Sequence, residues 1–382
     1  MNRIQRYVFR EVFAGTFLTL LILVFILTAG NALRDKLLQF MEGQFSLKFV
    51  IELFSLLLPY AVKFALPPAL LTGILLGLGR LSADSEITAM RASGFGLGKI
   101  AAPIFGLSLI LAGICFYINS WAAPQARTGY KEKLAQTAME NPLFFFQPGT
   151  FVTDFPGYIL YVGDFDGKNL HDFWIWSTAC QDEEPDEQGR IRQTMRFDYG
   201  IITADLDTNT LILEPRNLQI EINDEADPEN FQGDYRPGTA GNTILRFSLD
   251  KRGQDLKINR KPSMLSLEEL MKRRDRLANL DKLTESDKKQ LLETKMQLHT
   301  NASMACSVIA FAAIGIPLAI RTGRRETMAN AALALGLALG YYVLSILLGL
   351  LKDHPSFRPD LLAWLPNLLF LGCGLLLLRK AR

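Results

Sequence analysis

The chain has 382 residues, a formal net charge of +2 and a hydrophobic share of 49%. A net charge this close to zero excludes a strongly basic nucleic-acid binder and a strongly acidic tail protein. Of the four cysteines only Cys180 lies outside an apolar run, which excludes a disulfide within the polar middle of the chain. Apolar residues gather at both ends and charged residues in the middle, as in a membrane protein with an inserted extramembrane domain.

Three apolar segments precede the polar middle. The first, residues 12–33, follows three arginines and lacks a small-residue cleavage site, so we expect an uncleaved membrane span. Pro59, Pro67 and Pro68 interrupt the second segment. Because prolines bend or break helices, we expect an interfacial helix at residues 46–58 and then a kinked span at 62–81. The third span is predicted at residues 100–120.

The polar middle, residues 124–265, is predicted to be an all-β domain. Segments rich in aromatic and β-branched residues are bounded there by clusters of Gly, Pro, Asp and Asn, as is typical of strands. The predicted strands are residues 143–153, 158–164, 173–177, 196–203, 211–222 and 244–249. Repeated short strands with turn signals favour a sandwich or a jelly roll.

The rest of the chain returns to helical patterns. Residues 266–300 are predicted to form a charged helical linker, which Ser266 and Glu269 begin as a capping box. Further spans are predicted at residues 302–320, 328–350 and 361–378. The predicted fold is therefore six transmembrane helices in a 3+3 arrangement around an inserted all-β domain, a sandwich or a jelly roll. Its parts are residues 1–123, 124–265, 266–300 and 301–382.

The distribution of Lys and Arg predicts the orientation of the spans. One set of loops and termini carries twelve of these cations and the opposite short loops carry five. Basic loops face the cytoplasm, so both termini are expected there and the β-domain is expected outside, in the periplasm. Arg127, Lys131 and Lys133, just after the third span, are exceptions to this rule. Long translocated domains follow the rule only weakly, so the predicted orientation stands.

The search for catalytic chemistry points away from an enzyme. His171, His299 and His354 are scattered, and none has a ligand neighbour at helical spacing, so no metal site is predicted. The glycine-rich segment at residues 93–99 lacks both the first Gly and the Ser or Thr of a phosphate-binding loop, and no strand precedes it. No cofactor is expected on this chain.

The segment at residues 82–94 predicts a short helix between the second and third spans. Ser or Asp can cap its start, and Gly94 can end it. Glu86 suits its positive N-terminal end, and Ile87 and Met90 share one face. It is either an ordinary loop helix lying on the membrane or a coupling helix that docks in a groove of a cytoplasmic ATPase. In the second case the contact residues are Asp84, Glu86, Ile87, Met90, Arg91 and Gly94.

Short motifs in order along the chain resemble one known family. Gly79-Arg80-Leu81, then Asp84-Ser85-Glu86 and Arg91-Ala92-Ser93-Gly94, are similar to the signature of the LptF/LptG family of lipopolysaccharide-export permeases. Further matching pieces are Arg6-Tyr7 with Arg10-Glu11 at the start, Pro67, Trp121, Pro124, Gly315-Ile316-Pro317-Leu318 and Arg324-Arg325. The resemblance covers nearly the whole chain.

The resemblance implies a permease subunit of an ABC transporter in the bacterial inner membrane. Members pair with a second permease and a dimeric ATPase, which holds the ATP. Their paired cavity opens sideways between the first and fifth spans. Lipopolysaccharide enters it and passes into the periplasmic jelly roll, then to the jelly roll of a bridge protein by strand addition.

Three cations are candidates for binding the lipid phosphates. Arg34 and Lys36 follow the outer end of the first span, where snorkelling anchorage is the alternative. Lys63 lies in an otherwise apolar stretch, where a charge is costly unless it is paired or near the interface, and charges in such places usually serve a function. Two other hypotheses remain: a permease of a different ATPase-coupled lipid or lipoprotein exporter, and a membrane scaffold without transport activity.

Overall fold

The computed structural model describes residues 2–34, 47–140, 149–155, 158–166, 169–177, 193–205, 210–222, 236–242, 244–248, 261–279, 284–321, 327–350 and 358–381. These residues form two compact units. The helical unit comprises Met1–Tyr130 and Arg260–Arg382, and the second unit, Lys131–Asn259, contains the β-sheet.

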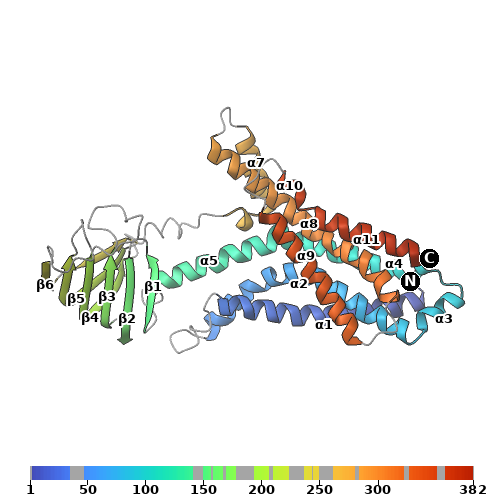
Figure 1. The fold of residues 1–382 in the computed structure, drawn as a ribbon, viewed down its shortest axis with the longest axis horizontal. Coiled ribbons are helices and arrows are strands. Elements are labelled where there is room, and N and C mark those ends of the chain that lie inside the picture. The colour runs from blue at the N-terminus through green and yellow to red at the C-terminus, as the bar shows by residue number, and fades with distance from the viewer. Residues whose placement is uncertain are drawn as a thin grey trace. The chain divides into compact units, whose positions relative to one another are not determined.

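Long helices build the first unit (Figure 1). Before the sheet come α1 (Arg3–Arg34), α2 (Leu47–Ala83), α3 (Glu86–Ala92), α4 (Leu97–Tyr117), the π-helical turn η2 (Ile118–Ala122) and α5 (Ala123–Glu140). After it come the 3-10 turn η4 (Pro262–Met264), α7 (Leu267–Ala278), α8 (Glu285–Arg321), α9 (Thr327–Gly349), α10 (Pro359–Leu362) and α11 (Leu365–Ala381).

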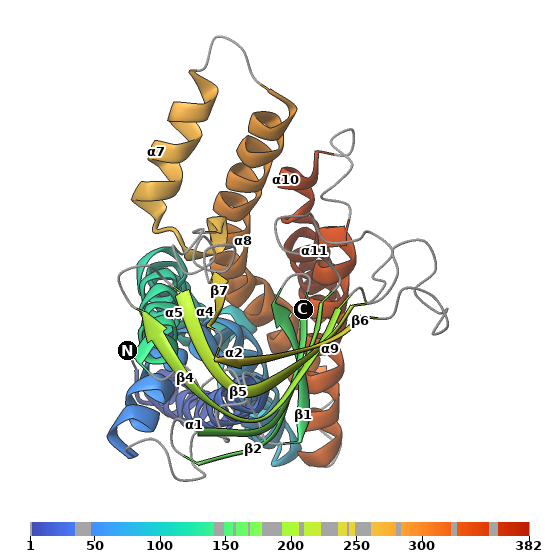
Figure 2. The same ribbon diagram turned by 90° about the vertical axis from the view of Figure 1, so that its left-hand side faces the viewer.

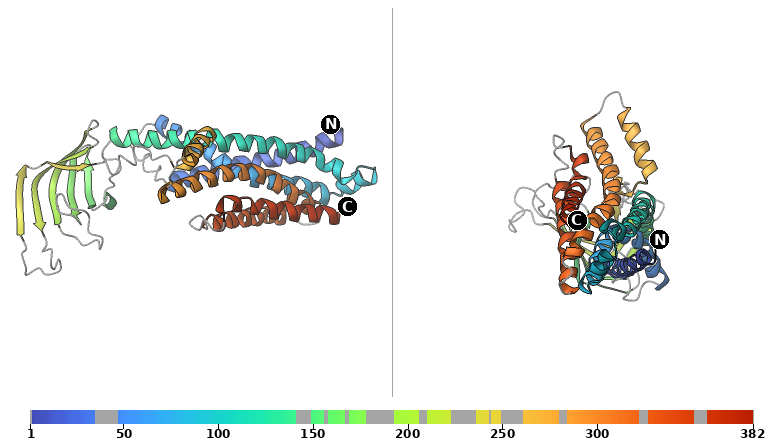
Figure 3. Two further views of the ribbon diagram at one scale, coloured as in Figure 1. Left: turned by 90° about the horizontal axis from the view of Figure 1, so that it is seen from above. Right: turned by 90° about the vertical axis from the view of Figure 1, so that its right-hand side faces the viewer.

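Within the described ranges, six helical segments are long and apolar enough to cross a membrane. They are Arg3–Asn31, Lys48–Ala83, Leu97–Lys133, Ser286–Arg321, Met328–Gly349 and Pro359–Lys380. Three precede the sheet and three follow it, so the predicted 3+3 arrangement is confirmed. The views in Figure 3 show these helices running alongside one another. Many apolar residues of α2, α4 and α8 belong to the buried core of this unit.

The helix α2 is continuous, so the prediction of a separate interfacial helix before residue 59 is wrong. Pro59, Pro67 and Pro68 all lie inside it. A proline at position 68 cannot donate to the carbonyl four residues earlier, which belongs to Phe64. The hydroxyl of Tyr342 on α9 donates to that carbonyl at 2.6 Å instead. Replacement donors from neighbouring helices are what make prolines tolerable in membrane helices.

The helices α1 and α2 touch backbone to backbone. A Cβ atom added to Gly73 would lie 2.5 Å from the Thr16 backbone nitrogen, and one added to Gly77 would lie 3.3 Å from the Val12 Cα. Small residues four apart let membrane helices approach this closely. The two helices therefore form a closely packed pair.

Two helices extend past the predicted domain limits. The helix α4 continues through η2 into α5, so the polar middle begins as a helix that reaches Glu140, where a β-domain was predicted from residue 124. The helix α8 runs from Glu285 to Arg321 and joins the predicted linker to the fourth span without a break.

The helix α7 packs beside the N-terminal part of α8, as Figure 2 shows. Ser266 begins α7 with the predicted capping box, in which its backbone N–H donates to Glu269 at 2.8 Å. Leu270 and Leu277 are buried, and Arg273 donates to Gln290 of α8 at 3.0 Å.

The second unit is built on one antiparallel sheet. Its strands are β1 (Thr150–Phe155), β2 (Tyr158–Asp166), β3 (Asn169–Ser177), β4 (Gln193–Asp205), β5 (Thr210–Ile222), β6 (Arg236–Asn242) and β7 (Leu245–Ser248). The order is β1-β2-β3-β4-β5-β6, with β7 also paired to β5. Alternate residues of β3, including Phe173 and Ile175, enter a buried cluster with Leu160, Met195 and Phe197.

The described strands agree with most of the predicted ones. The structure adds β6, whose Pro237, Gly238 and Gly241 give no alternating pattern that a sequence could reveal. Residues 143–148 of the first predicted strand lie outside the described residues. Neighbouring strands pair in chain order, so the antiparallel β-domain is confirmed, while its jelly-roll form stays a prediction.

Candidate functional site

The helix α3 stands at the end of the helical unit that also holds both chain termini (Figure 1). Ser85 precedes it with a φ of 61° and makes no side-chain capping bond, so the predicted side-chain cap is absent at that residue. At the other end Gly94, with a φ of 87°, donates to the Arg91 carbonyl, and Phe95 donates to the Met90 carbonyl. These two bonds form a Schellman motif, which confirms that Gly94 ends the helix.

The two apolar residues of α3 face the chain's own core. Ile87 is 3% exposed and belongs to the buried cluster of the helical unit, against which Met90 also packs. Asp84, Arg91 and Gly94 are exposed, and Glu86 is half-buried. Ile87 and Met90 therefore fix α3 to the bundle, and its polar residues form the face that a partner can reach.

Side chains from α1 reach α3 and the end of α2. The Tyr7 hydroxyl donates to Oε1 of Glu86 at 3.3 Å, and Arg80 forms an ion pair with Glu11 at 3.1 Å. Gln5 donates to the carbonyl of Lys99 on α4 at 3.3 Å. At this end of the bundle, Ser82 donates to the Ile320 carbonyl of α8 at 3.1 Å. The short helix is thus tied to α1 and α2 at an end of the bundle where α1 also contacts α4 and α2 also contacts α8.

A second group of side chains surrounds Lys63 on α2. Its ammonium lies 5.5 Å from the centre of the Phe64 ring, and the like charge of Arg127 is near enough to repel it. The guanidinium of Arg127, on α5, lies 5.2 Å from the centre of the Tyr60 ring. Within the described part of the chain, neither cation has a carboxylate partner. We call Tyr60, Lys63, Phe64 and Arg127 the cation–aromatic group.

Arg34 and Lys36 are the other two candidates for binding the lipid phosphates. Arg34 is the last residue of α1, and Lys36 lies outside the described residues. Arg127 was not among the predicted site residues. The signal that could have found it is a basic residue close to the predicted third span on the side where the distribution of Lys and Arg predicts few cations.

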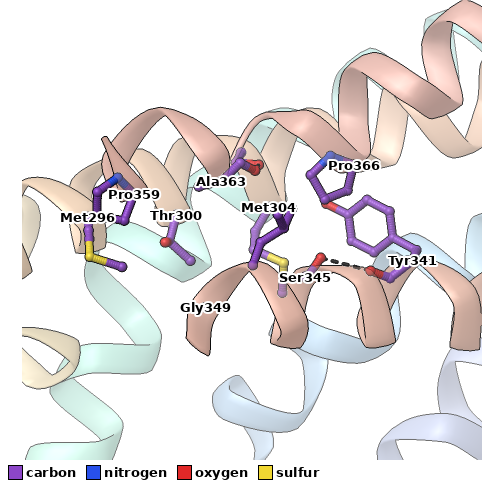
Figure 4. A pocket seen from close by; sticks show the side chains of 11 residues that line it. Met296, Thr300, Met304, Tyr341, Ser345, Gly349, Pro359, Ala363 and Pro366 are labelled. Atoms are coloured by element: carbon purple, nitrogen blue, oxygen red, sulfur yellow. Dashed lines mark hydrogen bonds between the residues drawn. The ribbon is translucent and has the colours of Figure 1, made fainter. Parts of the chain in front are cut away.

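A small pocket of about 90 Å³ lies between α8, α9, α10 and the start of α11 (Figure 4). Its lining includes Met296, Met304, Tyr341 and Pro366, and Ser345 donates to the Tyr341 carbonyl at 2.8 Å. Among the described residues, no His, Cys, Asp or Glu side chains gather in a group that could hold a metal ion.

The fold and these sites define a class: a multi-pass membrane protein with an inserted antiparallel sheet and a short helix held at the end of the bundle that carries both termini. The chain belongs to the lipopolysaccharide export system permease family LptF/LptG, whose model matches residues 6–380. This family consists of transporter permeases.

Individual relatives match part of the chain. It is 29% identical to the lipopolysaccharide export system permease protein LptG of Escherichia coli (strain K12) over 151 residues, which are 40% of this chain and 42% of that protein. It is 23% identical to LptG of Haemophilus influenzae over 177 residues, 46% of this chain and 49% of the relative. For Escherichia coli LptF the identity is 27% over 173 residues, 45% and 47% of the two chains. The matches thus span about half the length of these relatives.

Proposed function

We propose that this chain is a permease subunit of an ABC transporter that extracts lipopolysaccharide from the bacterial inner membrane. In this proposal both termini are cytoplasmic and the sheet is periplasmic, so that it can pass the lipid to a jelly-roll bridge protein. A separate ATPase dimer binds and hydrolyses ATP, and a second permease of the same family completes the cavity. Family membership over residues 6–380 supports the proposal.

The cation–aromatic group is the structural observation that carries it. Lys63 lies 20 residues before Ala83, the end of α2, and a helix rises about 1.5 Å per residue. Its Cα is therefore about 30 Å from that end, which equals the thickness of the hydrocarbon core. With α3 on the cytoplasmic side, Lys63 and Arg127 stand at the level of the outer-leaflet phosphates.

Two cations at that level, neither paired with a carboxylate of the described residues, suit an anionic lipid head group. A cation held in a membrane protein without a carboxylate nearby is costly, and an incoming phosphate removes that cost by forming charge-assisted hydrogen bonds. Before the lipid binds, cation–π contacts with the Phe64 and Tyr60 rings hold Lys63 and Arg127 in place. Arg34 and Lys36 would add charge at the end of α1.

The exposed face of α3 is the proposed ATPase contact. Asp84, Glu86 and Arg91 offer charges to a groove of the partner, while Ile87 and Met90 keep the helix attached to the bundle. A push on α3 then moves the membrane helices packed around it.

Affinity purification from the native host, in mild detergent, tests the proposal. The tagged chain should bring down an ATP-binding subunit and a second six-span permease, and Glu86→Arg should lose the ATPase. Glu268→Arg on the exposed face of α7 is the matched control, because it makes the same charge change far along the chain from α3.

The bound lipid separates the alternatives. Mass spectrometry of the purified wild type should find lipopolysaccharide, and its loss in a Lys63→Ala, Arg127→Ala variant supports the phosphate site. A complex that carries a lipoprotein instead indicates a different exporter. If no ATPase accompanies the folded wild type, the scaffold hypothesis replaces the transporter.

A further inference from the structure

Four side chains connect α1, α2 and α3 in one continuous group. Tyr7 and Glu11 lie four residues apart on α1, and so on one face of that helix. Glu11 pairs with Arg80 of α2 at 3.1 Å, and Tyr7 donates to Glu86 of α3 at 3.3 Å. Arg80 also interacts with the Tyr7 hydroxyl. The order Glu11–Arg80–Tyr7–Glu86 therefore runs from the first helix to the short one.

The connection between α3 and α2 is already tight. Only Asp84 and Ser85 separate the two helices, and the Asp84 N–H donates to the Arg80 carbonyl at 3.0 Å. Ile87 is buried in the bundle, which leaves α3 little freedom to move alone. A displacement of α3 must therefore reach Arg80.

The helix α1 lies at the boundary of the helical unit. It packs mainly against α2, through Gly15, Gly73 and Gly77, and also against α4. Its other face is apolar and exposed, with Phe17, Leu21 and Phe25 more than half exposed. Movement of α1 thus changes what this unit presents to the membrane.

The four-residue group adds little to folding stability. The side chain of Arg80 is 61% exposed, and ion pairs that water reaches contribute little to the stability of a fold. The group instead holds α1 in a fixed position relative to α2 and α3, because each of its bonds fixes the distance between two of these helices.

We propose that Tyr7 and Glu11 are positioning residues that transmit displacement of α3 to α1. This inference rests on the proposed function and deepens it. Glu86 serves two contacts at once: its Oε1 accepts from Tyr7, and its second oxygen, which accepts no hydrogen bond from the described residues, contacts the ATPase. The ATPase thereby acts on α1 through one intervening side chain.

Charge reversal in the reconstituted complex of ATPase and both permeases tests the proposal. The measured quantities are ATP hydrolysis and the amount of purified lipopolysaccharide released to the bridge protein. We expect Glu11→Arg and Arg80→Glu each to lower lipid released per ATP by about five-fold or more, the lower range of coupling between sites, while the ATPase stays bound. The Glu11→Arg, Arg80→Glu double variant should recover the ratio, because the ion pair forms again with its charges exchanged.

Tyr7→Phe is the second variant, since it removes only a hydroxyl and leaves the fold intact. It should also lower lipid released per ATP. Its control is Tyr117→Phe, because Tyr117 is 61% exposed and, in the described structure, its hydroxyl makes no hydrogen bond.

Each outcome decides between the two proposals. The positioning role is overturned if the double variant releases no more lipid per ATP than the worse single variant. It is also overturned if the single variants release as much lipid per ATP as the wild type. Either result leaves the proposed transporter function intact. A wild type that binds no ATPase overturns both.

Discussion

The hydroxyl of Tyr342 on α9 donates to the carbonyl of Phe64 on α2 at 2.6 Å. That carbonyl is the one that Pro68 leaves without a backbone donor. A residue 278 positions further along the chain thus completes the hydrogen bonding of a proline-containing helix. The same tyrosine ring packs edge-on against Phe64, with centroids 6.4 Å apart.

Tyr342→Phe should lower the free energy of unfolding by about 1 kcal/mol, because the partly buried Phe64 carbonyl loses the hydroxyl that replaces its backbone donor. The thermal midpoint of the purified protein in detergent measures this. Tyr117→Phe, at a residue that is 61% exposed, should leave the midpoint unchanged. Equal thermal midpoints for the wild type, Tyr342→Phe and Tyr117→Phe would show that another donor, such as water, forms the hydrogen bond to the Phe64 carbonyl.

Gly73→Ala should destabilise the α1–α2 pair, because the new methyl group would lie 2.5 Å from the Thr16 nitrogen. Overpacking of this kind costs roughly 1–3 kcal/mol. Gly106→Ala on α4 is the matched control, since no atom lies within 4 Å of its added Cβ. Alanine is favoured over glycine in a helix by about 0.5–1 kcal/mol, so Gly106→Ala should be neutral or stabilising. Thermal unfolding compares the two variants directly.

Gly94→Ala should weaken the end of α3, because its φ of 87° costs a residue with a Cβ about 1–2 kcal/mol. Hydrogen exchange of the α3 amides should then accelerate by roughly five- to thirty-fold. Gly96→Ala tests the same change two residues on, where φ is −64° and no atom crowds the Cβ position. Equal exchange rates in the two variants would contradict the Schellman ending.

Lys63→Met should affect stability and lipid binding in opposite directions. Removal of a half-buried cation that has no carboxylate partner in the described structure should keep or raise the thermal midpoint. Loss of a charged hydrogen bond to phosphate, about 1.5–3 kcal/mol, should weaken lipopolysaccharide binding by about ten-fold or more. Fluorescent lipopolysaccharide binding measures the second effect. Lys99→Met, an exposed cation beside α3, should change neither quantity.

Local composition was enough to find most secondary structure. A run of about twenty apolar residues can satisfy its backbone in a membrane only as a helix, so the six spans and their 3+3 division are visible in the sequence. Ser266 with Glu269, and Gly94, act on the helix next to them, and both behave as predicted. The strands with clear aromatic and branched residues are also local features, whereas β6 has none.

Tertiary contacts decided the rest, because they join residues that are far apart in the chain. The continuity of α2 depends on Tyr342, and the direction of Ile87 depends on a core assembled from α2, α4 and α8. Arg127 joins the cation–aromatic group only because α5 brings it to the Tyr60 ring of α2. The sequence by itself determined which segments become helices and strands, since those signals lie within a few residues. Only the tertiary structure decided which polar groups meet, because a hydrogen bond or ion pair depends on distance in space and not on spacing along the chain.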